Sequence, residues 1–361
     1  MATTHFGVND PETVKLWAKD LAREASKLTP IQPLIGDGPD SIIVKRTEMQ
    51  RNSGDRVTHT LLMNLDGAGV TEGIVQEGNE ESLATYTDNL SINELGHAVR
   101  IPGEGTIDRQ RVPYNLREMS RDGMKLWFAE RISATFFNHV CGYTPTNSLS
   151  HADLYRGNNA VVAATSTRIL RPNSVANDES LSSTDTFDLT LVEYARELAE
   201  TATPKIRPVM IGGQKKYVMY LHNYQATKLR TNTSDAQWLD IQRAALMGGK
   251  SSGNPLYTDA LGEYSNVILR VANDVTQGVN SSTGAAVANT RRAVLLGAQS
   301  AVIAWGKGHD STTSFKWVEA LHDYDRELGV HARMIWGMKK TVYNSTDFAT
   351  IVIPTYAAAS S

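Results

Sequence analysis

One segment of this 361-residue chain has too few large apolar residues to form a core of its own. Within 41–105, glycines separate short runs that are typical of strands, at 42–44, 57–63 and 91–95. The middle of the segment, 69–89, is the part poorest in large apolar side chains. We interpret it as a long two-stranded protrusion. An isolated hairpin is marginally stable in water, so this one needs a neighbouring surface to lie on.

The same segment is acidic. No Lys or Arg lies between Arg56 and Arg100, whereas seven acids do: Asp66, Glu72, Glu77, Glu80, Glu81, Asp88 and Glu94. The following stretch is basic and carries Arg100, Arg109, Arg111, Arg117, Arg121, Lys125 and Arg131. One interpretation is a solvated acidic loop beside an ordinary mixed helix. The other is a complementary pair of surfaces that meet between copies of the chain, where charge sets the register. The candidate contact residues are then Glu72, Glu77, Glu80, Glu81, Asp88, Arg109, Arg111, Arg117 and Arg121.

Two helices precede and follow this segment. The first begins at 9–12, where an Asn-Asp cap is followed by proline, and its apolar residues recur at helical spacing up to Pro30. Its flanks, 1–10 and 29–40, are rich in Pro, Gly and Asp, which suits an arm that packs on something else. The second helix, 113–142, is the strongest element. Its apolar face is predicted to comprise Leu116, Met119, Leu126, Trp127, Ile132, Phe136, Phe137 and Val140. Such a helix is about 40 Å long, which suits a shell building block better than a compact enzyme.

The remainder predicts a mixed α+β structure. A polar, turn-rich stretch covers 144–184, and a helix capped by Asp185 or Thr186 runs to Pro204. A hairpin is expected at 209–221 around Gly212-Gly213, a helix at 235–247 and a strand at 266–271. The apolar segment 292–305 fits either a helix or a strand. Three further strands are expected at 315–321, 330–343 and 348–356, with a turn at 344–347 between the last two.

Composition excludes several classes of protein. The 36 Lys and Arg against 39 Asp and Glu give a formal charge of −3, which argues against a strongly basic nucleic-acid binder. The one cysteine, Cys141, rules out an internal disulfide framework and is expected to be a buried, inert thiol. No run of 18 apolar residues and no signal peptide is present. We therefore expect a chain that is made and used inside a cell, or leaves it without the secretory route.

No catalytic template is complete. Residues 247–251 resemble the end of a phosphate loop, but the required first glycine is replaced by Ala244. The acidic segment 322–327 with His331 lacks the glycine of a calcium loop and a histidine pair at helical spacing, so a solvated loop is favoured over a metal site. The prediction is a protein without catalytic, cofactor-binding or metal-binding residues.

The order of elements resembles the major capsid proteins of phages with the HK97-like fold, and the residues resemble the N4-like major capsid family more closely. The similar pieces in the first third are Gly7-Val-Asn-Asp-Pro11, Leu16-Trp17, Leu21-Ala-Arg-Glu24, Glu77-Gly-Asn-Glu-Glu81, Tyr86-Thr-Asp-Asn-Leu90, His97-Ala-Val-Arg100 and Gln110-Arg-Val-Pro113. Those in the long helix are Arg117-Glu118, Arg121-Asp-Gly123, Trp127, Phe136-Phe-Asn138 and Cys141-Gly-Tyr-Thr144. The resemblance is strong over 1–145 and mainly one of pattern over 146–361.

The resemblance implies an α+β subunit with an HK97-like division of the chain. The implied parts are an N-terminal arm (1–40), an extended loop (41–105), a peripheral domain (106–205) with the spine helix 113–142, an axial domain (206–312) and C-terminal strands (313–361) that return to the peripheral domain. Such subunits form hexamers and pentamers of an icosahedral virion shell around double-stranded DNA, with a portal at one vertex. Scaffolding and cement proteins are possible partners, assembly takes place in the host bacterial cytoplasm, and no membrane is involved.

Some members of that fold weld their shells through a lysine in the extended loop, but this chain has no lysine between Lys45 and Lys125. Noncovalent overlap or a cement protein must then hold the shell. Two other functions stay open on the sequence: an encapsulin-like nanocompartment shell protein, and a soluble cytoplasmic hydrolase or binding module.

Overall fold

A computed structural model of the chain describes Leu21, Glu24, Ala25 and most residues from 28 to 359. The gaps lie at 51–52, 62–64, 66, 82–85, 114, 147–156, 212, 232–259 and 308–314. The expected helix at 235–247 and most of the first helix therefore lie outside the described residues. The described residues of that first helix, Leu21, Glu24, Ala25 and Leu28, are helical.

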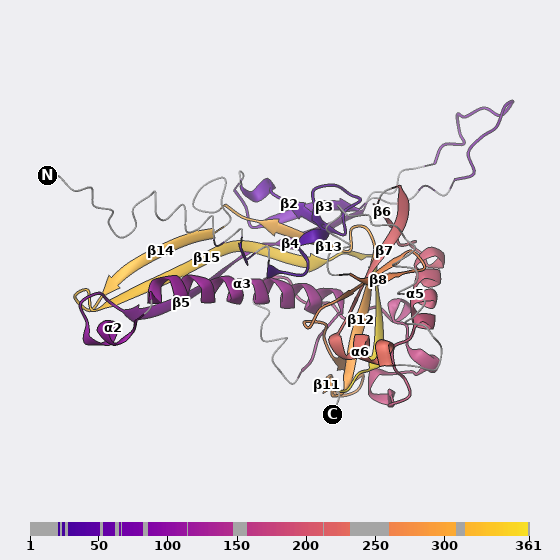
Figure 1. Cartoon of the computed structure of the whole chain (residues 1–361). Helices are drawn as coiled ribbons and strands as arrows, with labels where there is room; N and C mark the ends of the chain where they lie inside the picture. The colour runs from indigo at the N-terminus through magenta and orange to yellow at the C-terminus, as the bar shows by residue number, and fades with distance from the viewer. Residues whose placement is uncertain are drawn as a thin grey trace.

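A long sheet with a helix along it forms one half of the molecule (Figure 1). Its strands are ordered β1 (Ile35–Gly36), β2 (Ile43–Arg46), β13 (Ala301–Trp305), β15 (Glu327–Lys340) and β14 (Phe315–His322), and β5 (Asn93–Pro102) also pairs with β15. The helix α3 (Leu116–Val140) lies against this sheet, with Met124, Phe128 and Ile132 in one cluster with the buried side chains of β15. Its N-terminus follows a short helix, α2 (Ile107–Arg111).

A second sheet forms the other half. Its strands are ordered β18 (Thr350–Tyr356), β12 (Thr290–Leu296), β7 (Gln214–Leu221), β9 (Val267–Val271) and β8 (Ala260–Tyr264), with β6 (Val209–Ile211) paired to β7. Alternate residues of β7 face two cores. Tyr220 contacts Phe137 of α3 on one face, whereas Met219 packs with the helix α5 (Leu189–Thr201) on the other. The helix α6 (Asn223–Thr231) follows β7.

The predicted protrusion has a paired base and an irregular end. Strands β3 (Arg56–Leu61) and β4 (Tyr86–Ser91) pair antiparallel in register Arg56–Ser91 to Leu61–Tyr86. Residues 67–81 contain no strand, so the expectation of a two-stranded structure over 69–89 is wrong for this end. They form turns closed by Ile74 N–H to Thr71 O and Asn79 N–H to Gln76 O. Glycines at positive φ (Gly69, Gly73 and Gly78) bend the chain out of extended geometry there.

The expected helix 113–142 is confirmed with shifted ends. It begins at Leu116, because the Asn115 side chain accepts the Arg117 N–H, and Gly142 ends it in a left-handed conformation. A Cβ at Gly142 would lie 2.3 Å from Ala164 N, so only glycine fits. The prediction that Met119 and Leu126 belong to the apolar face is wrong, because these side chains are 53% and 61% exposed.

Most of the other expected elements are confirmed, and one expected helix cap is wrong. The hairpin at 209–221, the strand at 266–271 and the strands at 315–321, 330–343 and 348–356 are confirmed within a few residues. The segment 292–305 is two strands, β12 and β13, which belong to different sheets. The cap of α5 is Asp188, which accepts the Leu191 N–H, whereas Asp185 accepts the N–H of Ser182. The stretch 157–184 contains three short 3₁₀ turns, η3 (Ser166–Arg168), η4 (Pro172–Ser174) and η5 (Asp178–Ser180).

The remaining short elements complete the described part of the chain. They are η1 (Gln32–Leu34), η2 (Glu48–Gln50) and the two-stranded ladders β10 (Gly278–Val279) with β11 (Ala286–Val287) and β16 (Val342–Tyr343) with β17 (Thr346–Asp347). The sheets cross the expected domain limits, because β13 of 206–312 pairs with β15, and β18 of 313–361 pairs with β12. The division into domains itself stays a prediction.

Candidate assembly surfaces

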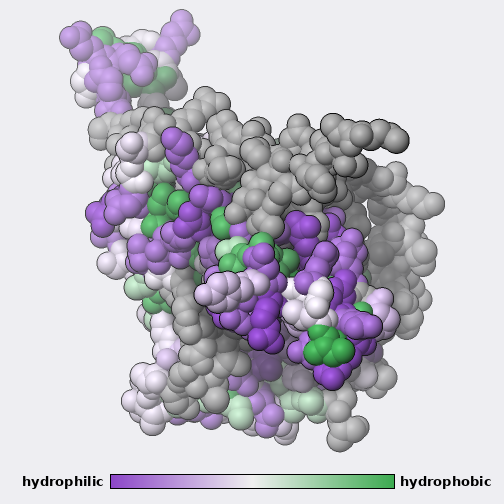
Figure 2. Space-filling model, turned by 90° about the vertical axis from the view of Figure 1, so that its left-hand side faces the viewer, coloured by the Kyte–Doolittle hydropathy of each residue, from purple (hydrophilic) through white to green (hydrophobic). Residues whose placement is uncertain are grey.

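The acidic loop, residues 67–81 between β3 and β4, projects away from the body of the molecule. In Figure 1 it extends beyond the second sheet at the upper right, and in Figure 2 it stands apart at the top. Every residue from 71 to 81 is exposed, including the apolar Ile74 (57%) and Val75 (70%). Two of its hydrogen bonds lie within the loop: the Glu81 carboxylate accepts the Gly67 N–H, and the Glu80 carboxylate accepts the Gly78 N–H. The loop therefore offers acidic and apolar side chains to a partner without burying them in its own chain.

The base of the loop is attached to the first sheet by a partly buried ion pair beside a buried histidine. Asp88 of β4 accepts a hydrogen bond from the Lys339 ammonium at 2.6 Å, and Asp88 lies opposite His59 of β3 in the ladder. His59 is 3% exposed, and neither of its ring nitrogens has a hydrogen-bond partner. The pKa of His59 is lowered to about 4, chiefly by burial; the nearby Asp88 carboxylate opposes this change, and the charges of Arg46 and Lys339 add to it. Asp88 thus holds the loop to its own chain.

The predicted arginines lie at the opposite end of the molecule from the loop, around α2 and the start of α3 (Figure 1). Arg117 forms two hydrogen-bonded contacts of 2.8 Å with Glu319, which is 2% exposed and also accepts the Trp317 indole N–H. Arg111 pairs with Asp108 at 3.0 Å, and Arg121 pairs with Asp122 at 3.4 Å. Arg109 is partly exposed on α2. The fold does not bring the acidic loop and these arginines together within one chain.

Figure 2 looks onto the end of the molecule that carries α2 and the β14–β15 turn. Hydrophilic residues dominate the described surface there, and the hydrophobic ones form separate patches. The acidic segment 322–327, considered above as a metal site, forms this turn. Among the residues that the structure describes, no group of three or more His, Cys, Asp and Glu side chains could hold a metal ion. Residues 247–251 lie outside the described residues.

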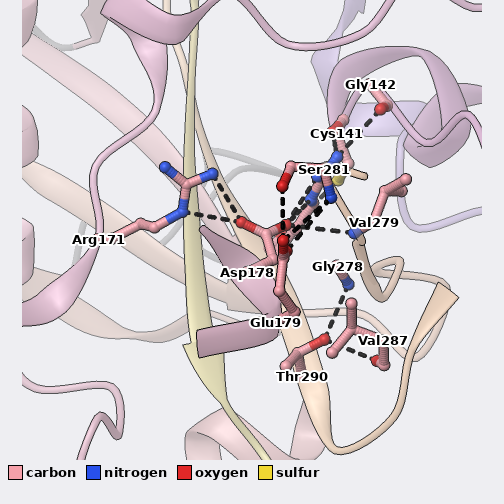
Figure 3. A network of polar contacts seen from close by, with 11 residues as sticks. Cys141, Gly142, Arg171, Asp178, Glu179, Gly278, Val279, Ser281, Val287 and Thr290 are labelled. Carbon is pink, nitrogen blue, oxygen red and sulfur yellow. Dashed lines mark hydrogen bonds and ion pairs between the residues drawn. The ribbon is translucent and has the colours of Figure 1, made fainter. Parts of the chain in front are cut away.

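A buried polar network joins α3 to the second sheet (Figure 3). Asp178 of η5, 1% exposed, accepts hydrogen bonds from Arg171 on one oxygen, at 2.8 Å, and from Arg292 of β12 on the other, at 2.7 and 2.9 Å. The remaining guanidinium nitrogen of Arg292, Nη1, donates to the carbonyl oxygens of Cys141 and Gly142, each at 3.0 Å. These are carbonyls left unpaired at the C-terminus of α3, where a cation is favourable. Sequence reasoning missed this network because its members are up to 151 positions apart.

Two further buried groups lie near the same junction. The Lys340 ammonium, fully buried, pairs with Asp347 at 2.7 Å and donates to the Ala163 carbonyl. Burial lowers the pKa of Lys340, and Asp347 opposes that change. Cys141 is fully buried, as predicted, and burial raises the pKa of its thiol, which keeps it protonated and unreactive. None of the helices in the described part of the chain is long and apolar enough to cross a membrane.

Comparison with known proteins gives one consistent result. A family model described as phage capsid protein matches residues 5–359. The major capsid protein of Pseudomonas phage KPP25 is 26% identical over 392 aligned residues, which cover 99% of this chain and 98% of that protein. The capsid of Ralstonia phage GP4 superimposes with a TM-score of 0.81 at 28% identity, covering 99% of both chains. The capsid protein of cyanophage Pam1 shares the fold, with a TM-score of 0.65 at 19% identity, covering 100% of this chain and 95% of the other.

We expect the buried Asp178 to stabilise the subunit far more than an exposed acid. Asp178→Asn removes the negative charge between Arg171 and Arg292 and should lower the free energy of unfolding by about 3 kcal/mol, because it leaves buried cations without a counter-charge. Asp108→Asn, which breaks an exposed pair with Arg111, is the matched control and should change it much less. Urea unfolding of the unassembled subunit measures both. Equal, small losses would contradict the role assigned to Asp178.

We expect the subunit to lose stability in acid through His59. The pKa of its imidazole is about 4 in the folded chain and about 6.5 in an unfolded one, so the unfolded state binds more protons between these values. The contribution of His59 to the free energy of unfolding is then present in full above pH 6.5 and is lost as the pH falls toward 4. The loss at pH 5 is on the order of 2 kcal/mol. The His59→Gln variant should flatten the dependence between pH 5 and 7; an unchanged slope in urea unfolding would refute the assignment.

Proposed function

Because this chain belongs to the phage capsid protein family, we propose that its copies associate noncovalently into the hexamers and pentamers of an icosahedral shell. It is a phage major capsid protein with the HK97-like fold, and it is a component of the virion. The observation that carries the proposal is the projecting loop. Its residues 71–81 are all exposed, although two of them, Ile74 and Val75, are large and apolar. Such a loop gains burial from a neighbouring copy.

The proposed contacts between copies involve opposite charges. Glu72, Glu77, Glu80 and Glu81 of the loop and Arg109, Arg111, Arg117 and Arg121 at the far end are the candidates. The two groups lie at opposite ends of one chain, which supports a meeting between chains (Figure 1). Arg117, Arg111 and Arg121 also form ion pairs within the chain. We therefore propose that they determine how neighbouring copies align more than how tightly the copies bind. Asp88 acts at the base of the loop through Lys339.

The proposed division of the chain follows the resemblance noted in the sequence. Residues 1–40 form the N-terminal arm, 41–105 the extended loop, 106–205 the peripheral domain, 206–312 the axial domain, and 313–361 the returning strands. The long sheet with α3 supports a peripheral domain, and β7, β9 and β12 support an axial one. The pieces quoted from 7–144 support membership of the N4-like subgroup.

The remaining partners follow from the same role. The shell encloses double-stranded DNA by weak, nonspecific contact, for which a formal charge of −3 is suitable because tight phosphate binding would resist packaging. The portal, a scaffolding protein and a cement protein are the further partners, and the shell assembles in the cytoplasm of the bacterial host. A cement protein or noncovalent overlap between subunits holds the shell together, because no lysine lies between Lys45 and Lys125 to form a covalent cross-link from the extended loop. The chain acts without catalytic, cofactor or metal chemistry.

The purified protein should form particles of megadalton mass. Light scattering and electron microscopy measure the mass and the shape, and nuclease treatment of particles from infected cells should leave protected double-stranded DNA. Particles that protect a protein cargo and no DNA would favour a nanocompartment shell. A stable monomer or dimer under all conditions of assembly would refute the proposed function.

Reversing the charge of the loop should block assembly without unfolding the subunit. Glu77, Glu80 and Glu81 are exposed, so their triple replacement by Lys should leave the far-ultraviolet circular dichroism unchanged and reduce the yield of particles at least tenfold. The same number of reversals on α5, at Glu193, Glu197 and Glu200, is the control for net charge. Normal particles from the loop variant, or an equal loss in the control, would contradict a specific role of the loop.

A further inference from the structure

The base of the acidic loop contains a buried histidine beside a carboxylate that has one unused oxygen. His59 of β3 and Asp88 of β4 lie directly opposite each other in the ladder, so their Cβ atoms are about 5 Å apart. One oxygen of Asp88 accepts the Lys339 ammonium at 2.6 Å and the Asn89 N–H at 2.8 Å. The other oxygen is buried and, among the described residues, has no hydrogen-bond partner. Neither ring nitrogen of His59 has such a partner there, so the two side chains are neighbours that share no hydrogen bond.

Cations outnumber carboxylates around His59. The long sheet contributes Lys339 of β15 and Arg46 of β2, and the hairpin β3–β4 contributes Asp88. Arg46 itself pairs with the exposed Glu48 at 3.5 Å. Strand β13, which also packs against the hairpin, has no charged side chain. A proton on His59 therefore adds a third positive charge beside a single carboxylate, in a place where burial already disfavours a charged imidazole.

Two kinds of contact attach the hairpin to the long sheet. The first is apolar, because buried side chains of β3 and β4 pack in one cluster with Val44 of β2 and Val302 of β13. The second is the ion pair between Asp88 and Lys339. Within the described part of the chain, no strand of the long sheet forms a ladder with β3 or β4. The ion pair therefore restrains the angle of the hairpin at the junction where β4 continues into β5.

We propose that this base is an acid-sensitive latch, in which a proton taken up by His59 moves the Asp88 carboxylate from Lys339 to His59. The protonated imidazole donates a charge-assisted hydrogen bond to the unused oxygen of Asp88 and repels Lys339 and Arg46, which both belong to the long sheet. An ion pair between the hairpin and the long sheet thus becomes an ion pair inside the hairpin. The hairpin stays paired through its backbone ladder, and the loop is free to change its angle.

The direction of the pH dependence follows from linkage. With the latch closed, burial is the main reason that the pKa of His59 is about 4, and the two cations lower it while Asp88 opposes them. In the open state water reaches the imidazole and the two cations are farther away, so its pKa rises toward about 6.5 or above. The open state binds the proton more tightly, and the latch opens as the pH falls from 6.5 toward 4. This inference goes beyond the proposed function, because it concerns a single subunit and requires no shell.

Distances between two spin labels test the latch in the full-length, unassembled subunit. The labels are attached at Val75→Cys on the loop and Met210→Cys on β6, both exposed positions, while the buried Cys141 stays unlabelled. Pulsed electron spin resonance should show that the width of the distance distribution at least doubles between about pH 7.5 and about pH 4.5. A second pair, at Met210→Cys and Leu126→Cys, reports on the body of the molecule and should not change.

Three further substitutions are made in the labelled loop variant. His59→Gln cannot take up the proton and should keep the distribution narrow at both pH values. Asp88→Asn removes the carboxylate and should give the broad distribution already at pH 7.5. The matched control is His331→Gln, because His331 is another half-buried histidine with a lowered pKa, on β15, and its loss should leave the pH response of the loop unchanged.

Each outcome decides the proposal. Broadening in acid that His59→Gln abolishes and His331→Gln does not, together with a broad distribution for Asp88→Asn at pH 7.5, supports the latch. An unchanged loop distribution at pH 4.5, equal broadening with His59→Gln, or a narrow distribution for Asp88→Asn would overturn it. A change in the Met210–Leu126 pair before any change at the loop would also overturn it, because the body would then open before the latch. None of these results depends on whether the chain forms particles.

Discussion

The packing of α3 along the long sheet is the contact on which the rest of the structure depends. The helix has 25 residues and β15 has 14, so the two are about 38 and 46 Å long. Met124, Phe128 and Ile132 bury one side of the helix against β15, and Phe137 continues the contact onto β7 of the second sheet. One continuous apolar core therefore runs through both halves. The acidic loop and the arginines of α2 and the start of α3 lie at opposite ends of this core, out of reach of each other within a chain (Figure 1).

Buried ions mark the place where the two halves join. A helix as long as α3 ends in carbonyl groups that need donors, and Arg292 supplies them while Asp178 balances its charge. An apolar substitute could fill the same volume, but it would leave the carbonyls of Cys141 and Gly142 without these donors. The network also requires one relative position of η5, β12 and the end of α3, because each partner has a fixed hydrogen-bond direction. The network therefore restrains this relative position in addition to contributing to stability.

Sequence patterns predicted the elements whose signals are local. The long helix, the hairpin around 212–213 and the strands near the C-terminus follow from periodicity, glycine and cap residues, and they are confirmed. Met119 and Leu126 were assigned to the buried face wrongly, because a helix with acids and arginines on all sides has no unique apolar stripe until the sheet is placed. The expectation of two strands over 69–89 is wrong at 69–81, because a scarcity of large apolar residues indicates that a segment has no core of its own but does not determine whether its strands pair. The partners of Asp88 and Arg117 depend on Lys339 and Glu319, more than 200 positions away, which no local pattern reveals.

The distribution of charge along this nearly neutral chain favours one specific arrangement of neighbouring copies in the proposed shell. A surface rich in one sign over the whole molecule would repel its copies, whereas here one stretch without Lys or Arg, between Arg56 and Arg100, carries seven acids and includes the projecting loop. The loop has hydrogen bonds within itself, which docking need not break, so in the proposed assembly the burial of Ile74 and Val75 is opposed chiefly by the ordering of an exposed segment. Each such contact is modest. In the proposed shell every subunit repeats the contact, and a subunit held on two sides must break both contacts to leave, so the lattice is far more stable than a single pair. Weak, directional and repeated contacts allow misplaced subunits to dissociate during growth, which one strong contact would prevent.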